Sequence, residues 1–91
     1  MQLRVTTPAK PPADIVLGYG YHDGVHTFCI EEIPGLVVLD WSLRRAYDDA
    51  IRGMRKLVEC IYGSDICYDI LDDFTEFEKY KRVRCQLRTI H

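Results

Sequence analysis

On the incoming side of Asp23-Gly24 the residues Ile15, Leu17, Tyr19 and Tyr21 alternate with Val16, Gly18, Gly20 and His22. On the outgoing side Val25, Thr27, Cys29 and Glu31 alternate with His26, Phe28, Ile30 and Glu32. A period of two is typical of a β-strand. Asp-Gly is a strong signal for a two-residue hairpin turn, because glycine tolerates positive φ and aspartate does so better than most residues. The segment 14–32 therefore predicts a β-hairpin. Gly18 and Gly20 in its first strand indicate either a bulge or a close backbone approach.

A corner at Pro34-Gly35 separates this hairpin from the next apolar run. The run "LVVLDW", Leu36–Trp41, contains little polarity, so it predicts a third short strand that is buried on both faces. Ser42 follows directly and is a residue type that caps helices. The order of these signals predicts a strand, a turn, a second strand and then a helix.

The longest periodic pattern predicts a helix from Ser42 to Tyr62. Nine apolar residues share one stripe at about 100° per residue: Leu43, Ala46, Tyr47, Ala50, Ile51, Met54, Leu57, Val58 and Ile61. The opposite face carries charges of opposite sign four residues apart, such as Arg44 with Asp48. Gly63 is well placed to end the helix.

Two further elements complete the prediction. Ile66, Ile70, Phe74 and Phe77 share a stripe, which indicates a second, shorter helix that begins at Ser64 and ends near Tyr80. The segment 81–91 alternates with a period of two and places arginines on one face, so it predicts a terminal strand. We expect residues 1–13 to form either a strand or a mobile arm, together with a proline-rich connector that leads into the hairpin.

These elements predict one small α+β domain over residues 1–91, in the order β-β-β-α-α-β. An antiparallel sheet of three to five strands would carry the 42–62 helix on one face, with the shorter acidic helix at its edge. A length of 91 residues, with 47% hydrophobic and 29% charged residues, is typical of a single globular core.

The composition also bears on location and on the thiols. No apolar run approaches the roughly 20 residues that span a membrane, and residues 1–10 lack the apolar region of a secretory signal. The four cysteines include no C-x-x-C pair. We therefore expect a cytoplasmic protein with reduced, mostly buried thiols and no membrane contact.

Candidate catalytic and metal-binding residues are few. His22-Asp23 could be a metal or general-base pair, but Asp-Gly is explained by turn geometry alone. His22 and His26 could face each other across the turn, and two ligands without a third are a weak metal signal. No G-x-S-x-G, H-E-x-x-H or Walker-type loop occurs. We expect no enzyme activity, no metal and no cofactor.

Acidic residues gather in the second predicted helix. The segment Asp65–Tyr80 holds six acids and one lysine, a local charge of −5. This flank is either a solvated face or a docking surface for a basic protein partner. Tyr19 and Tyr21, beside glycines on the hairpin, are further interface candidates. The candidate partner-binding set is Asp65, Asp69, Asp72, Asp73, Glu76, Tyr19 and Tyr21.

The arginines of the terminal strand have two interpretations. Arg82, Arg84 and Arg88 could contact nucleic-acid phosphates, or they could neutralise the acidic helix beside them. We favour neutralisation. An open edge at the N-terminal or C-terminal strand would also permit a homodimer.

The succession of hairpin, Pro-Gly corner, short strand and amphipathic helix resembles the HicB antitoxin family. The matching residues are Glu32-Ile33-Pro34-Gly35-Leu36, followed by Ser42-Leu43, Ala46 and Ala50. The resemblance covers roughly residues 15–62. It implies a partial RNase H-like β-β-β-α-β fold, no intrinsic enzyme activity, and binding of a small basic toxin that cleaves RNA. The acidic segment 65–80 lies outside the match.

Two functions remain open at this point. The first is a non-catalytic module that sequesters a basic partner, as an antitoxin-like neutraliser of an RNA-cleaving toxin. The second is a phage- or plasmid-encoded inhibitor of a nucleic-acid-binding machine, such as a CRISPR complex, whose acids imitate phosphates. A DNA-binding regulator that uses the terminal arginines ranks below both.

Overall fold

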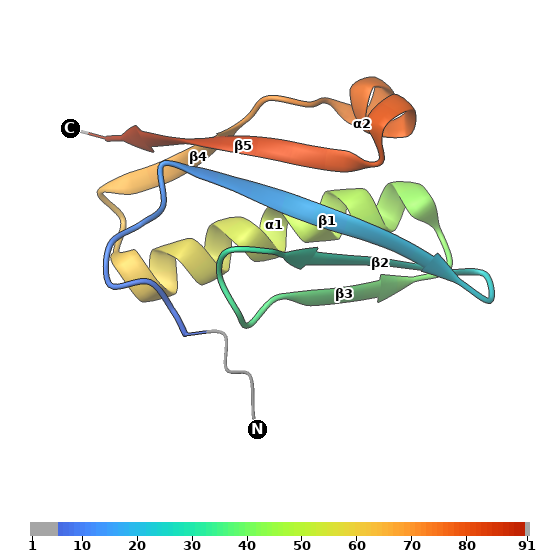
Figure 1. The fold of residues 1–91 in the computed structure, drawn as a ribbon, viewed down its shortest axis with the longest axis horizontal. Helices are drawn as coiled ribbons and strands as arrows, with labels where there is room; N and C mark the ends of the chain where they lie inside the picture. Colours follow the sequence, from blue (N-terminus) through green and yellow to red (C-terminus); the bar gives the residue numbers. More distant parts are fainter. Residues whose placement is uncertain (1–5, 91) are drawn as a thin grey trace.

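Two helices and a five-stranded sheet make up the part of the chain, residues 6–90, that the computed structural model describes (Figure 1). In chain order the elements are β1 (Asp14–His22), β2 (Val25–Ile30), β3 (Val37–Asp40), α1 (Leu43–Tyr62), β4 (Ile66–Ile70), α2 (Phe74–Tyr80) and β5 (Arg82–Thr89). The α+β fold class is confirmed. Of residues 1–13, expected to form a strand or an arm with its connector, the described part, residues 6–13, belongs to no strand, and the rest lies outside the described residues.

The sheet is antiparallel between all neighbours, in the order β3-β2-β1-β5-β4. The predicted terminal strand is confirmed as β5, which lies between β1 and β4. Asp14 of β1 is opposite Gln86 of β5, so the centre of the sheet joins the two ends of the described chain. No helix among the described residues is long and apolar enough to cross a membrane.

The predicted hairpin is confirmed as β1 and β2. Asp23 and Gly24 both have positive φ, 50° and 83°, as a tight two-residue hairpin turn requires. The register runs without interruption from Leu17 opposite Ile30 to the turn, so the strand has no bulge there. The close approach occurs instead, because a Cβ on Gly20 would lie 2.8 Å from Thr27 Oγ1.

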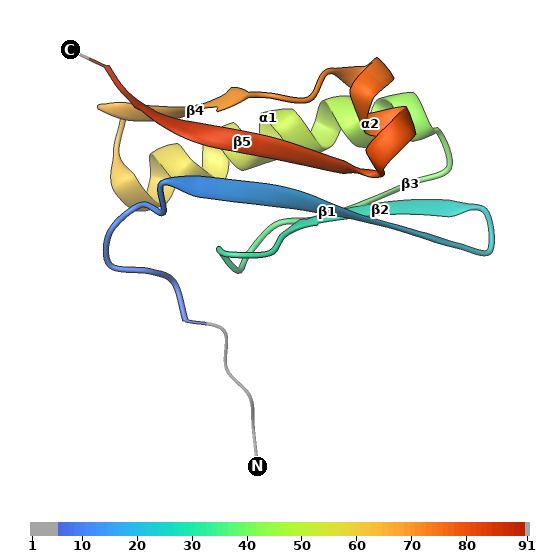
Figure 2. The same ribbon diagram turned by 45° about the horizontal axis from the view of Figure 1, so that its top comes forward.

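The long helix is also confirmed. The Ser42 hydroxyl accepts a hydrogen bond from the Arg45 backbone N–H at 3.3 Å, and Gly63, with φ of 88°, follows the last turn. One face packs on the sheet through Ala46, Tyr47, Ala50, Met54 and Val58. Figure 2 shows α1 lying along one side of the strands.

The single helix expected between Ser64 and Tyr80 is wrong in its first half. Residues 66–70 form the edge strand β4, and only Phe74–Tyr80 form a helix. Ile66 and Ile70, four residues apart, share a face in a strand as they would in a helix, and buried Tyr68 lies between them. The order is therefore β-β-β-α-β-α-β.

The α2 helix has its own end signals. Its N-cap is Asp73, not Ser64, and the Asp73 side chain accepts from the Glu76 N–H at 2.9 Å. Lys81, in the left-handed conformation with φ of 57°, ends it. Phe77 packs on Phe28 of β2, with ring centroids 5.2 Å apart. This contact places α2 on the side of the sheet that α1 covers.

The expectation that the third strand is buried on both faces is wrong. β3 is an edge strand, and its face away from α1 is open: Val37 is 73% exposed, Leu39 65% and Trp41, just beyond the strand, 73%. Val38 faces the helix side and packs against the core. Because α1 covers one face only, an apolar run here does not mean full burial.

Candidate functional site

Asp72, predicted on an exposed acidic flank, is instead completely buried. Its carboxylate accepts three hydrogen bonds from Arg84: from the backbone N–H at 2.9 Å, from Nε at 3.0 Å and from Nη2 at 2.9 Å. The Tyr47 hydroxyl donates to the Asp72 backbone carbonyl at 3.0 Å. Asp72 therefore holds β5 to the segment before α2, and its buried side chain is not accessible to a binding partner.

A second arginine completes this cluster. Arg82 Nη1 lies 3.5 Å from Asp72 Oδ2 and is buried without a hydrogen-bond partner of its own. The hydrogen bonds from the Arg84 side chain, followed by its backbone N–H and the nearby positive charges, hold the Asp72 pKa below its usual value despite burial. The same carboxylate raises the pKa of Arg84. The group is a structural ion cluster.

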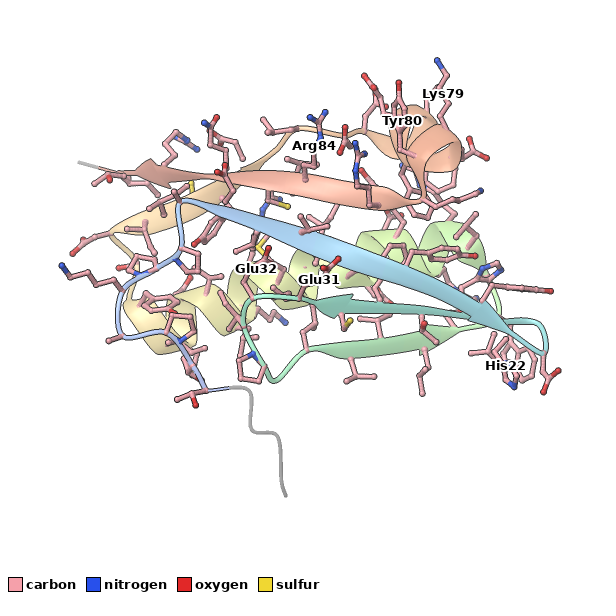
Figure 3. All side chains as sticks on the ribbon, in the orientation of Figure 1. His22, Glu31, Glu32, Lys79, Tyr80 and Arg84 are labelled. Atoms are coloured by element: carbon pink, nitrogen blue, oxygen red, sulfur yellow. The ribbon has the colours of Figure 1, made fainter. Side chains whose placement is uncertain are left out.

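The remaining terminal arginine is also paired. Arg88 Nε lies 2.9 Å from Asp69 Oδ1, and both side chains are about half exposed. Figure 3 shows Arg84 on β5, close to the segment that precedes α2. The ion pairs of Arg82 and Arg84 with Asp72, and of Arg88 with Asp69, agree with neutralisation, although both acids lie outside α2. Phosphate contact by these arginines stays a lower-ranked prediction.

The structure therefore divides the predicted acidic flank. Asp65, which is exposed, stands before β4, and its carbonyl accepts from the Ile90 N–H at 2.7 Å. Asp73 and Glu76 are exposed at α2, at the other end of β4. Glu78 is exposed on the same helix. Of the five predicted acids, only Asp73 and Glu76 are both exposed and close together.

Tyr19 joins the hairpin to this helix. Its ring packs on Phe77 of α2 with centroids 5.1 Å apart, and its hydroxyl is 2.6 Å from His26 Nδ1. Burial raises the pKa of Tyr19. Tyr21, two residues closer to the turn, packs against His26 with centroids 4.9 Å apart and is 62% exposed.

The tip of the hairpin and α2 consequently lie at the same end of the molecule (Figures 1 and 2). We call four of the exposed residues at this end the α2 surface: Tyr21, Asp73, Glu76 and Glu78. Lys79, Tyr80 and Lys81 are also exposed on or beside α2. The α2 surface combines one aromatic ring with three carboxylates. Tyr19 supports this surface from beneath.

Sequence reasoning missed an exposed apolar row on the other side of the sheet. We call Val37, Leu39 and Trp41 the edge row. Beside it lies an open hollow lined by Val25, Leu39, Asp40, Trp41 and Arg45. The alternation of these three residues is present in the sequence, but the apolar Val38 between two of them hides the period of two.

The histidine and cysteine candidates stay apart. His22 Nε2 lies 3.3 Å from Asp23 Oδ2 at the exposed turn, and Figure 3 shows His22 at the hairpin tip. Among residues 6–90 no group of three or more histidine, cysteine, aspartate or glutamate side chains is placed to hold a metal ion.

The thiols differ from expectation. All four are free, but only Cys85 is buried, while Cys29 and Cys60 are exposed and Cys67 is half-buried. The prediction of mostly buried thiols is wrong. Burial raises the pKa of Cys85 to about 12, so this thiol stays protonated and unreactive.

Comparisons with protein-family models, with curated proteins and with solved structures find no significant match for this chain.

Proposed function

We propose that this domain is a non-catalytic protein-binding module that captures a basic partner at the α2 surface. The observation that carries the proposal is the packing of Tyr19 on Phe77. This contact fixes the aromatic hairpin beside the exposed acids of α2, so that one end of the molecule offers both apolar contact area and negative charge.

The two parts of the surface have different roles in binding. Tyrosine is enriched at interfaces because its ring supplies contact area and its hydroxyl stays hydrogen-bonded. Tyr21 is the exposed ring of this surface, and Tyr80 on α2 is exposed as well. The carboxylates of Asp73, Glu76 and Glu78 attract a positively charged protein over a distance and increase its association rate. Lys79 and Lys81 nearby are also exposed, so the attraction is moderate and selects partners by shape as well as charge.

The narrower proposal is an antitoxin-like role, in which the captured partner is a small RNA-cleaving toxin. The order of the first five elements, β-β-β-α-β, is the order that the resemblance to HicB antitoxins implies, and this agreement supports the proposal. The chain adds α2 and β5 to that order, and β5 lies between β1 and β4. The acids that we assign to the partner lie on this added part.

A test must remove charge without removing structure. The variant Asp73→Asn/Glu76→Gln/Glu78→Gln neutralises the α2 surface and keeps an N-cap, because asparagine caps helices as well as aspartate does. Asp72 is left unchanged because of its place in the buried cluster. The matched control, Asp14→Asn/Glu31→Gln/Glu59→Gln, removes three exposed charges away from the hairpin tip and α2.

Small basic proteins of the host that co-purify with the tagged wild type would be identified by mass spectrometry, and their binding measured by calorimetry. We expect the α2 variant to weaken binding by about tenfold or more, and the control by about twofold or less. Binding by the wild type should also weaken as salt rises. Equal affinities for the two variants would refute the assignment to α2.

The alternative function is inhibition of a nucleic-acid-binding machine, with the same carboxylates imitating phosphates. Both functions use the same negatively charged surface, so the activity of the captured partner must distinguish the antitoxin from the inhibitor. A captured protein that degrades RNA once released supports the antitoxin class. A captured component of a DNA- or RNA-binding complex supports the inhibitor class.

A further inference from the structure

We propose that the domain forms a symmetric dimer in which β3 pairs with β3 of a second copy, in antiparallel orientation and centred on Leu39. This dimer is independent of the partner-binding function proposed above. It rests on the backbone and side-chain directions of the edge row, Val37, Leu39 and Trp41.

The register determines which backbone groups of β3 are free. The two-residue turn makes His22 and Val25 a hydrogen-bonded pair, and such pairs alternate along an antiparallel ladder. The bond from the Glu31 N–H to the Val16 carbonyl, 3.1 Å, continues this alternation. Phe28 of β2 therefore directs its backbone groups toward β3, where Val38 is its partner.

It follows that Val37 and Leu39 direct their N–H and C=O groups away from β2, toward the open edge. Their side chains lie on the face without α1 and are largely exposed. A strand added here would therefore gain backbone hydrogen bonds and apolar side-chain contacts at the same residues. Edge strands often avoid this through short length, a charged side chain, a proline or a bulge. β3 is short and ends in Asp40, but it contains no lysine or proline, and the residues that face the open edge, Val37 and Leu39, are uncharged.

The other edge of the sheet differs in this respect. On β4, the bond from the Leu71 N–H to the Arg84 carbonyl, 2.8 Å, shows that the odd-numbered residues bond toward β5. The residues with backbone groups at the open edge are then Ile66, Tyr68 and Ile70, whose side chains pack in or against the core. An added strand would meet no exposed apolar row there, so β3 is the edge suited to pairing.

A second copy fits this edge better than the basic partner does. In the symmetric register Leu39 faces Leu39, and Val37 faces Trp41 of the other copy, so every exposed apolar side chain of the row meets another. The edge row carries no charge, and the neighbouring Asp40 is already paired with Arg45 at 3.3 Å. No like charges oppose the pairing, and no charge here selects a cationic protein.

The size of the contact sets its strength. Three exposed side chains and one short strand cover less than the roughly 800 Å² per partner of a standard stable interface. We therefore expect a dimer that forms and separates with concentration. Sedimentation velocity from micromolar to millimolar protein should show the mass rise from 10.6 kDa toward twice that value. A wild type that stays monomeric throughout would overturn the proposal.

Leu39 offers a sharp test because it faces itself in this register. Leu39→Lys and Leu39→Glu should each be monomeric, since each places two like charges on the symmetry axis. An equimolar mixture of the two should associate again, because lysine then faces glutamate. Leu71→Lys, a change at an exposed leucine away from β3, is the matched control and should dimerise like the wild type.

A backbone variant separates strand pairing from a general apolar contact. Leu39→Pro removes an N–H that only the open edge uses, and proline is tolerated on edge strands. We expect it to keep the far-UV circular dichroism of the wild type and to lose the dimer. A folded Leu39→Pro that still dimerises, or a lysine–glutamate mixture that stays monomeric, would refute pairing through β3.

Discussion

Replacing Asp72 with asparagine removes the charge at the centre of the buried cluster and keeps the size of the side chain. The carboxylate accepts three hydrogen bonds from Arg84. An asparagine offers one oxygen to these donors and turns an NH₂ group toward the others. Arg82 Nη1, which is buried and has no other partner, also loses the nearby negative charge.

The expected cost follows from burial. Removing one partner of a fully buried ion pair costs about 3–5 kcal/mol. Asp72 is fully buried, but the Arg84 side chain is 51% exposed. Because water replaces part of what Arg84 loses, we expect the free energy of unfolding to fall by about 2–3 kcal/mol, which is a large part of the roughly 5–15 kcal/mol of a small domain.

Urea unfolding followed by far-UV circular dichroism measures this change. Trp41 is a poor fluorescence probe for the purpose because it is already exposed in the folded protein. The control is Asp69→Asn, which breaks the half-exposed pair with Arg88 and should cost less than about 1 kcal/mol. If Asp72→Asn costs no more than Asp69→Asn, the cluster does not hold β5 in the way described.

The pH dependence supplies a second check. Arg84 lowers the pKa of folded Asp72, whereas the pKa of an aspartate in the unfolded chain is about 3.9. The carboxylate therefore stabilises the fold above about pH 4, and this contribution is lost as pH falls through the lowered pKa. The difference in stability between wild type and Asp72→Asn should be constant near neutral pH and shrink in acid. A difference that grows in acid would contradict this assignment.

Two other predictions concern packing and the thiols. Gly20→Ala should lower the melting temperature, since its Cβ would lie 2.8 Å from Thr27 Oγ1. Adding Thr27→Ala should restore part of the loss. An unchanged melting temperature for Gly20→Ala would contradict the close approach. In a thiol titration near neutral pH, exposed Cys29 and Cys60 should react quickly, and buried Cys85, whose pKa is about 12, only after unfolding. Rapid reaction of Cys85 in the folded protein would contradict its burial.

Elements with strong local signals could be predicted from the sequence. The hairpin needs only Asp23-Gly24 and its alternating flanks, and α1 needs only Ser42, the apolar stripe and Gly63. In each case the signal that starts or ends the element lies within a few residues of it. Local propensity and the final structure agree there.

The errors arise where distant residues decide the outcome. Ile66 and Ile70 fit a helix or a strand equally well, and the pairing with β5 selects the strand. Asp72 can be buried because it pairs with Arg84, twelve residues away on β5. The sequence does not show this pairing, so a local cluster of acids indicated an exposed surface. The apolar run of β3 indicated full burial because a sequence does not reveal which strand occupies the edge of a sheet.

The position of β5 in the sheet has a consequence for how the protein is made. β1 is translated early but needs β5 as its neighbour, and β4 needs β5 as well. Before β5 is synthesised, β4 has no strand to pair with and β1 lacks its neighbour on one side. Pairing between such distant segments is slow to form, so the nascent chain is exposed to aggregation until β5 leaves the ribosome. A stop codon at Lys81 would make that exposed intermediate permanent.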